Sequence, residues 1–145
     1  MLQTNRDSNN FGFFIENSAI SNVSLYSLNW STYLTQIPGS VEVNTINYDD
    51  LLTKYKLKFN TLVIDNEGNF VNMLKDFPTI LDGIKLLIIE HDFNTEDDLY
   101  YFKKTLTQSG LKMEDMFLKT ERYGPGMNWA DGINTDPIFV SVWKK

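Results

Sequence analysis

The chain has 145 residues, of which 42% are hydrophobic and 14% aromatic, as in a globular protein with one core. Its formal net charge of −6 excludes non-specific binding to nucleic acid or anionic membranes, and the absence of cysteine excludes disulfides and thiolate chemistry. No apolar run approaches the ~20 residues of a membrane span and the first residues do not resemble a signal peptide, so we expect one soluble, cytoplasmic domain over residues 1–145.

The first third of the chain predicts short strands followed by one helix. The polar residues Leu2–Asn10 indicate a helix end or a turn. Alternating or aromatic patterns predict strands, and Asn47 is placed to cap a helix with acidic residues in its first turn. The expected strands are Phe11–Ile15, Val23–Leu28 and Val41–Ile46, and the expected helix is Tyr48–Tyr55.

The stretch Thr61–Leu74 contains the clearest signal in the chain. Its apolar run Leu62–Ile64 predicts a strand buried on both faces, and a helical period follows it. Between strand and helix lie Asp65, Glu67 and Gly68, a turn that needs glycine for its backbone. Because ligands bind at the carboxyl ends of strands in open α/β sheets, this turn is the first place to expect chemistry.

A second apolar run, Ile84–Ile89, also ends in polar residues, Glu90-His91-Asp92. Thr95 and Gly110 mark the start and end of the best predicted helix. The remaining elements are a strand over Leu111–Thr120, a long loop over Arg122–Asp136 and a final strand over Pro137–Trp143. Two parallel strands joined by a crossover helix predict an α/β, Rossmann-like, mostly parallel sheet with helices on its faces.

The chain resembles the second half of the FkbM-type S-adenosylmethionine-dependent methyltransferases. The resemblance covers nearly the whole chain. It is carried by the blocks Val43–Leu52, Thr61–Gly68 and Leu86–Glu90, by Gly110, and by the pieces Leu2–Arg6 and Ser18–Ser21. It implies a partial class I methyltransferase-like fold with a C-terminal antiparallel strand. It also implies O-methyl transfer to a small molecule or sugar if the N-terminal part of the family's domain is supplied.

The resemblance also shows which family features the chain lacks. Family members begin with a strand and a Gly-rich turn that holds S-adenosylmethionine, followed by a second strand with an acidic residue for the ribose. Neither is present here, so we expect this chain alone to bind the cofactor weakly or not at all. By position in the family, Asn17 and Ser18 are candidates for contacting the adenine. The family often has a further acidic residue where this chain has Phe70.

Four residues are candidates for catalysis: Asp65, Glu67, Glu90 and His91. A carboxylate within hydrogen-bond reach of a hydroxyl can orient it or take its proton, and His91 is the one side chain that titrates near neutral pH. The alternative for Asp65 and Glu67 is a structural role in the turn and at the helix N-terminus. The alternative for His91 is a structural or simply exposed side chain.

Two other classes of function stay open. A sheet that lacks its first strands exposes an edge, which predicts a non-catalytic domain stabilised as a homodimer. Asp65 and Glu67 at a strand end also suit a metal-dependent nuclease or phosphatase, provided that further carboxylates converge there. Asp65, Glu90, His91 and Asp92 could together hold a divalent ion, but no sequence-local ligand spacing supports a metal site. The acidic charge disfavours polynucleotide substrates.

Overall fold

The computed structural model describes residues 2–29, 31–93, 95–119 and 137–145. The chain forms two compact units, Met1–Leu57 and Lys58–Lys145, each of which is described by itself. The single methyltransferase-like domain expected from the sequence stays a prediction. The loop predicted over Arg122–Asp136 lies outside the described residues. No helix in the described part of the chain combines the length and hydropathy that a membrane crossing needs.

The described residues of the unit 1–57 form two helices and five short strands. They are α1 (Leu2–Ser8), β1 (Ala19–Ile20), β2 (Leu25–Leu28), β3 (Ser31–Tyr33), β4 (Val41–Val43), β5 (Thr45–Ile46) and α2 (Tyr48–Tyr55). β1 pairs with β5 in parallel, while β3, β2 and β4 form an antiparallel sheet in that order. Two strands thus cover the predicted strand Val41–Ile46.

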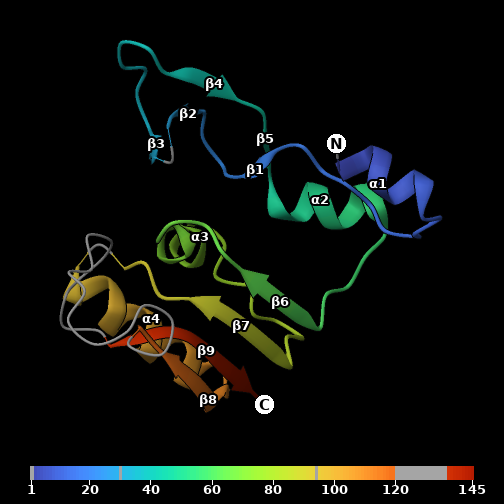
Figure 1. Cartoon of the computed structure of the whole chain (residues 1–145). Coiled ribbons are helices and arrows are strands. Elements are labelled where there is room, and N and C mark those ends of the chain that lie inside the picture. Colours follow the sequence, from blue (N-terminus) through green and yellow to red (C-terminus); the bar gives the residue numbers. More distant parts are fainter. Residues whose placement is uncertain (1, 30, 94, 120–136) are drawn as a thin grey trace. The chain divides into compact units, whose positions relative to one another are not determined.

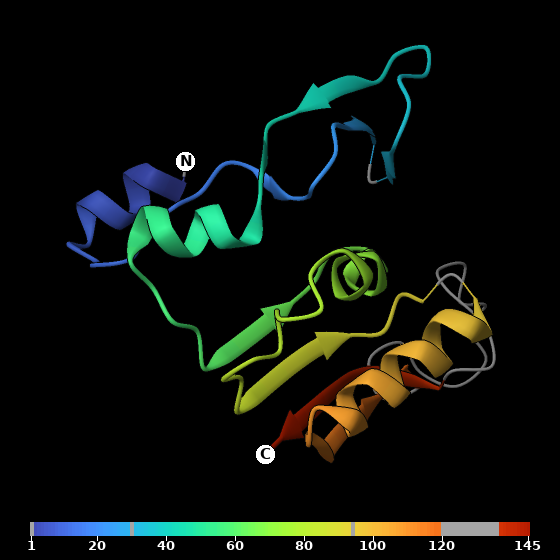
Figure 2. The same cartoon turned by 180° about the vertical axis from the view of Figure 1, so that it is seen from behind.

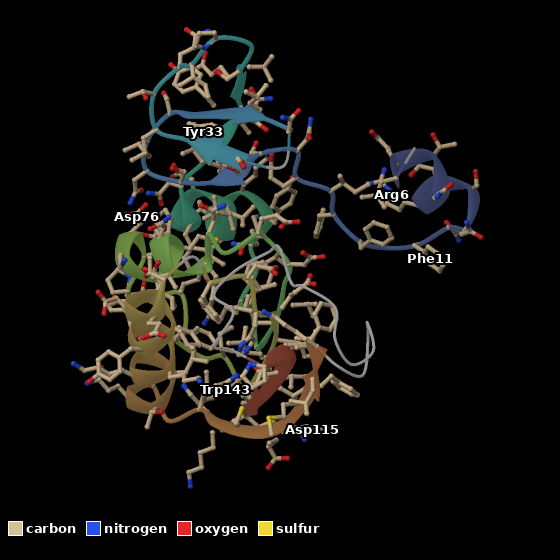
Figure 3. The ribbon with its side chains drawn as sticks, turned by 60° about the vertical axis from the view of Figure 1, so that its left-hand side comes forward. Arg6, Phe11, Tyr33, Asp76, Asp115 and Trp143 are labelled. Atoms are coloured by element: carbon tan, nitrogen blue, oxygen red, sulfur yellow. The ribbon has the colours of Figure 1, made fainter. Side chains whose placement is uncertain are left out.

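The strand predicted over Phe11–Ile15 is wrong. These residues adopt no regular secondary structure, and the side chains of Phe11 and Phe14 are 60% and 61% exposed. Aromatic residues favour a strand only where a neighbouring strand completes the hydrogen-bond ladder, and the segment has no pairing partner in the described residues. Figure 3 shows Phe11 on the segment that also carries α1 and Arg6.

Helix α2 begins and ends where its local signals predict. Asn47 Oδ1 accepts a hydrogen bond of 2.8 Å from the N–H of Asp49, and Asp49 and Asp50 lie in the first turn. At the other end, Lys56 adopts a left-handed conformation with φ 53°, and its N–H bonds the last carbonyls of the helix. The predicted span Tyr48–Tyr55 is confirmed.

In its described residues, the unit 58–145 forms one mixed sheet together with the helices α3 and α4. Its elements are β6 (Thr61–Ile64), α3 (Phe70–Asp76), β7 (Leu86–Glu90), α4 (Glu96–Gln108), β8 (Lys112–Leu118) and β9 (Ile138–Lys144). The strands lie side by side in the order β6-β7-β9-β8 (Figure 1). β6 and β7 are parallel, whereas β9 is antiparallel to both β7 and β8. The strands β6, β7 and β8 therefore run in one direction, and β9 runs against them.

This topology corrects the expectation of a mostly parallel sheet. Only one of the three neighbouring pairs, β6 with β7, is parallel. The reason is the position of the last strand, which enters between β7 and β8 and makes both of its pairings antiparallel. The fold is a mixed α/β arrangement of parallel and antiparallel strands with helices, and the C-terminal strand is antiparallel as expected.

The core lies on one face of this sheet, which we call the inner face. On β7 it presents Leu87 and Ile89, and helix α4 lies against this face (Figure 2). The ring of Phe102 on α4 lies 5.6 Å from that of Trp143 (labelled in Figure 3). The other face, the outer face, is not covered in the same way: Val63 is 71% exposed. The expectation that β6 is buried on both faces is wrong.

Candidate functional site

Three carboxylates meet at the carboxyl edge of the sheet. The parallel register pairs Ile64 with Ile89, so that Asp65 and Glu90 follow at neighbouring strand ends. One carboxylate oxygen from each of Asp65, Glu90 and Asp92 lies within 4.8 Å of the other two. Asp65 is exposed and the other two are half-buried. We call these three residues the acidic cluster.

The turn after β6 directly follows Asp65 of the acidic cluster. Glu67 and Gly68 both adopt positive φ angles, of 52° and 79°, before α3 begins at Phe70. The backbone role expected for Gly68 is confirmed, because this conformation strains most other residues. Asn69 closes the turn by donating from its side-chain amide to the carbonyl of Asn66 over 3.2 Å. Glu67 is exposed and is not a member of the acidic cluster.

His91 lies between two members of the acidic cluster in sequence but on the other face of the strand. Successive side chains alternate along an extended chain, so His91 falls on the inner face with Ile89, opposite to Glu90. It is 1% exposed, and its Nε2 lies 2.6 Å from Oγ of Ser141. Of the four residues that the sequence offered for a divalent ion, the structure thus brings the three carboxylates together and leaves His91 out.

The surroundings of His91 belong to the core. Its ring lies 5.1 Å from that of Phe93 and 5.8 Å from that of Phe102, in edge-to-face geometry. Ser141 Oγ also accepts a 2.7 Å hydrogen bond from the indole Nε1–H of Trp143, so this hydroxyl joins the two rings in the core. A proton-accepting role for His91 stays a prediction, and this geometry gives it no support.

Asn17 and Ser18 lie in the unit 1–57, directly before β1. Ser18 Oγ donates to Glu16 over 2.9 Å, and Glu16 also accepts from Lys54 Nζ at 2.7 Å and from the hydroxyl of Tyr55 at 2.8 Å. The hydrogen bond from Lys54 is the largest cause that lowers the pKa of Glu16 to about 2. The segment before β1 is thus bound to α2 by one ionised carboxylate.

Lys119 is a further residue of the carboxyl edge that the sequence did not indicate. It follows the end of β8, which runs in the same direction as β6 and β7. Its N–H donates to the carbonyl of Pro137 over 2.9 Å, and only 5% of the residue is exposed. The sequence around it predicts an ordinary strand and gives no sign of this burial.

Two groups could bind at such a site, a divalent metal ion and S-adenosylmethionine, and its residues suit the metal ion better. Clustered carboxylate oxygens are the ligands that Mg²⁺, Mn²⁺ and Ca²⁺ prefer, although exposed acidic groups are common without an ion. S-adenosylmethionine needs a Gly-rich turn, whereas each glycine in the described residues stands alone in the sequence. The described residues therefore do not fit the cofactor.

Comparison with known proteins leaves the geometry as the main basis for function. No family model, curated protein or solved structure matches the chain.

Proposed function

We propose that the unit 58–145 forms the acceptor side of a methyltransferase-like protein of the FkbM type, acting by O-methyl transfer on a small molecule or sugar. The observation that carries the proposal is the acidic cluster at the ends of two parallel neighbouring strands. The carboxyl edge of parallel strands is where open α/β sheets bind their ligands. Asp65, Glu90 and Asp92 there offer several acceptors for hydroxyl groups.

The strand order supports the finer fold assignment. A Rossmann-like sheet of the methyltransferase type is expected to end in a reversed strand, and β9 is reversed between β7 and β8. The crossover from β6 through α3 to the parallel strand β7 is the βαβ unit on which such a sheet is built.

The chemistry assigned to the chain's own residues is the handling of a hydroxyl. Asp65, the most accessible member of the acidic cluster, accepts a hydrogen bond from the acceptor hydroxyl and takes its proton as the oxygen becomes nucleophilic. Glu90 and Asp92 accept bonds from neighbouring hydroxyls and fix the orientation of the ligand. We assign no role in this step to Glu67 or His91, which are outside the acidic cluster.

The proposal is tested by titrating the ¹⁵N-labelled protein with a panel of monosaccharides and following backbone amide shifts. We expect the shifts to centre on the amides of Asp65, Glu90 and Asp92. Because a hydrogen bond to a charged group is lost, Asp65→Asn should weaken binding about tenfold. The matched control is Asp82→Asn, an exposed carboxylate of another turn. If every sugar leaves both strand ends unshifted, the proposal is wrong.

A second candidate is metal-dependent phosphoester hydrolysis. It requires several carboxylates around one ion, and Glu90 and Asp92 meet that requirement together with Asp65, in place of the expected Glu67. Manganese added to the labelled protein distinguishes the two functions. Line broadening centred on the acidic cluster, together with manganese-dependent hydrolysis of a phosphodiester, would favour hydrolysis over methyl transfer.

A further inference from the structure

The outer face of the sheet in the unit 58–145 carries a row of apolar side chains. Val63, Ile88 and Val142 are paired across three neighbouring strands and therefore project from the same face. Val63 is 71% exposed and the other two are half-buried. In contrast, Leu87 and Trp143, their neighbours on the inner face, are 0% and 5% exposed. The described residues thus cover the inner face and leave the outer face partly accessible.

The rows on either side of this one extend the apolar surface. One contains Leu86 on β7, and the other contains Val140 on β9 opposite Phe117 on β8, which is 52% exposed. We call six side chains the outer patch: Val63, Leu86, Ile88, Phe117, Val140 and Val142. Strands about 4.8 Å apart and about 17 Å long give the four-stranded face an area of roughly 300 Å². An apolar patch of a few hundred Å² is among the largest that a soluble monomer exposes, and such patches often bind a partner.

The two ends of the outer face carry opposite charges. Where β8 begins and β9 ends, Lys112 and Lys144 lie directly opposite each other, and Lys144 Nζ lies 3.1 Å from a carboxylate oxygen of Glu114. At the other end lies the acidic cluster, whose Glu90 projects from the same face as Ile88, two residues before it. Like charges that lie beside each other are destabilising, so a surface of opposite charge would stabilise either end.

We propose that the outer patch is the interface of a homodimer, in which two outer faces pack against each other with their strands antiparallel. A second copy suits this surface, because an apolar centre between a basic and an acidic end is complementary to itself across a two-fold axis. With the axis across the strands at the row of Ile88, Lys144 faces Val140 of the second copy. It then lies one strand spacing, about 4.8 Å, from the strand that carries Glu90. An axis along the strands would instead bring like charges together.

The mass of the protein in solution tests the interface, and it is measured without a ligand, so its outcome is separate from that of the proposed function. Sedimentation equilibrium should show a homodimer at tens of micromolar. Lys144→Glu should weaken dimerisation about tenfold, because it places a carboxylate beside the acidic end of the second copy. Lys104→Glu is the matched control, since it changes the charge equally at an exposed position of α4. A wild-type monomer, or equal effects of the two variants, overturns the inference.

A further substitution distinguishes packing of two outer faces from pairing of two β6 edges. Val142→Lys puts a charge at the centre of the outer patch, on a strand that has a neighbour on both sides. It should dissociate a face-to-face dimer and leave an edge-to-edge dimer intact. Met113→Lys is the control, because Met113 is 43% exposed and lies opposite Trp143 on the inner face. A dimer that survives Val142→Lys overturns the inference, and Lys144→Glu decides the question if Val142→Lys does not fold.

Discussion

The two faces of the sheet in the unit 58–145 differ in what their side chains do. On the inner face, Leu87, Ile89 and His91 are buried. The ring of His91 lies 5.8 Å from that of Phe102 on α4, and its Nε2 has a hydrogen-bond partner in Ser141. On the outer face, Val63 is exposed, and at the carboxyl edge Glu90 lies in the acidic cluster. Residues adjacent in sequence thus divide between stability and ligand binding. Substitutions on the inner face should lower the free energy of unfolding, whereas substitutions at the carboxyl edge should weaken ligand binding.

The largest effect on stability is expected at Phe102. It is 0% exposed, and its ring lies near those of Phe70, His91 and Trp143. Phe102→Ala should lower the free energy of unfolding by about 3–5 kcal/mol, because it removes a buried ring and leaves a cavity. Tyr100→Ala on the same helix is the control, since Tyr100 is 67% exposed. Equal effects in urea denaturation would show that the inner face is not the core.

A smaller loss is expected at Ser141. Ser141→Ala leaves the indole N–H of Trp143 and Nε2 of His91 without their partner in the core. The free energy of unfolding should fall by about 1–3 kcal/mol. Thr107→Ala is the comparison, because its exposed bond to the carbonyl of Lys103 should be worth less than about 0.5 kcal/mol. A neutral Ser141→Ala variant would contradict the assignment of His91 to the core.

At the carboxyl edge of the sheet, substitutions should affect ligand binding and not stability. Asp65→Asn or Asp92→Asn should change the free energy of unfolding by less than about 0.5 kcal/mol, because these groups are not in the core and like charges surround them. Ligand binding should nevertheless be weakened in both variants. A loss of stability as large as that of Ser141→Ala would instead indicate a structural role for the acidic cluster.

The homodimer expected from the sequence can be tested by a substitution in strand β6. Its exposed Val63 lies on the outer face of an edge strand that carries no charge, whereas the other edge strand, β8, carries Glu114 and Asp115. Charges on an edge strand oppose pairing with another chain. Light scattering at tens of micromolar should detect a dimer that Val63→Lys dissociates, while a wild-type monomer would contradict the prediction.

In the other unit, the smallest effect concerns the titration of Glu16. Its carboxyl resonance should titrate with a pKa of about 2, and Lys54→Met should raise this pKa toward 4.5. The pKa of Glu16 is lowered in the folded protein, so its contribution to stability is present above pH 4.5 and is lost as the pH falls toward 2. An unchanged pKa in Lys54→Met would show that Lys54 is not the cause.

Features of this structure that depend on neighbouring residues were easier to predict from the sequence than features that depend on distant segments. The cap at Asn47 and the turn at Gly68 were predictable, because each depends on a few neighbouring residues. That Asp65 and Glu90 come together followed from the parallel strands before them. The insertion of β9 and the exposure of Val63 depend on distant segments and could not be predicted.

The central claim is that the ends of β6 and β7 bring their carboxylates together. It can be tested directly, because the chain has no cysteine of its own. The double variant Asp65→Cys, Glu90→Cys should form an intramolecular disulfide under mild oxidation, since the two side chains leave neighbouring strands at the same edge. The control pair, Glu67→Cys with Glu90→Cys, should oxidise much more slowly. Equal rates for the two pairs, or a first pair that stays reduced, would contradict the account.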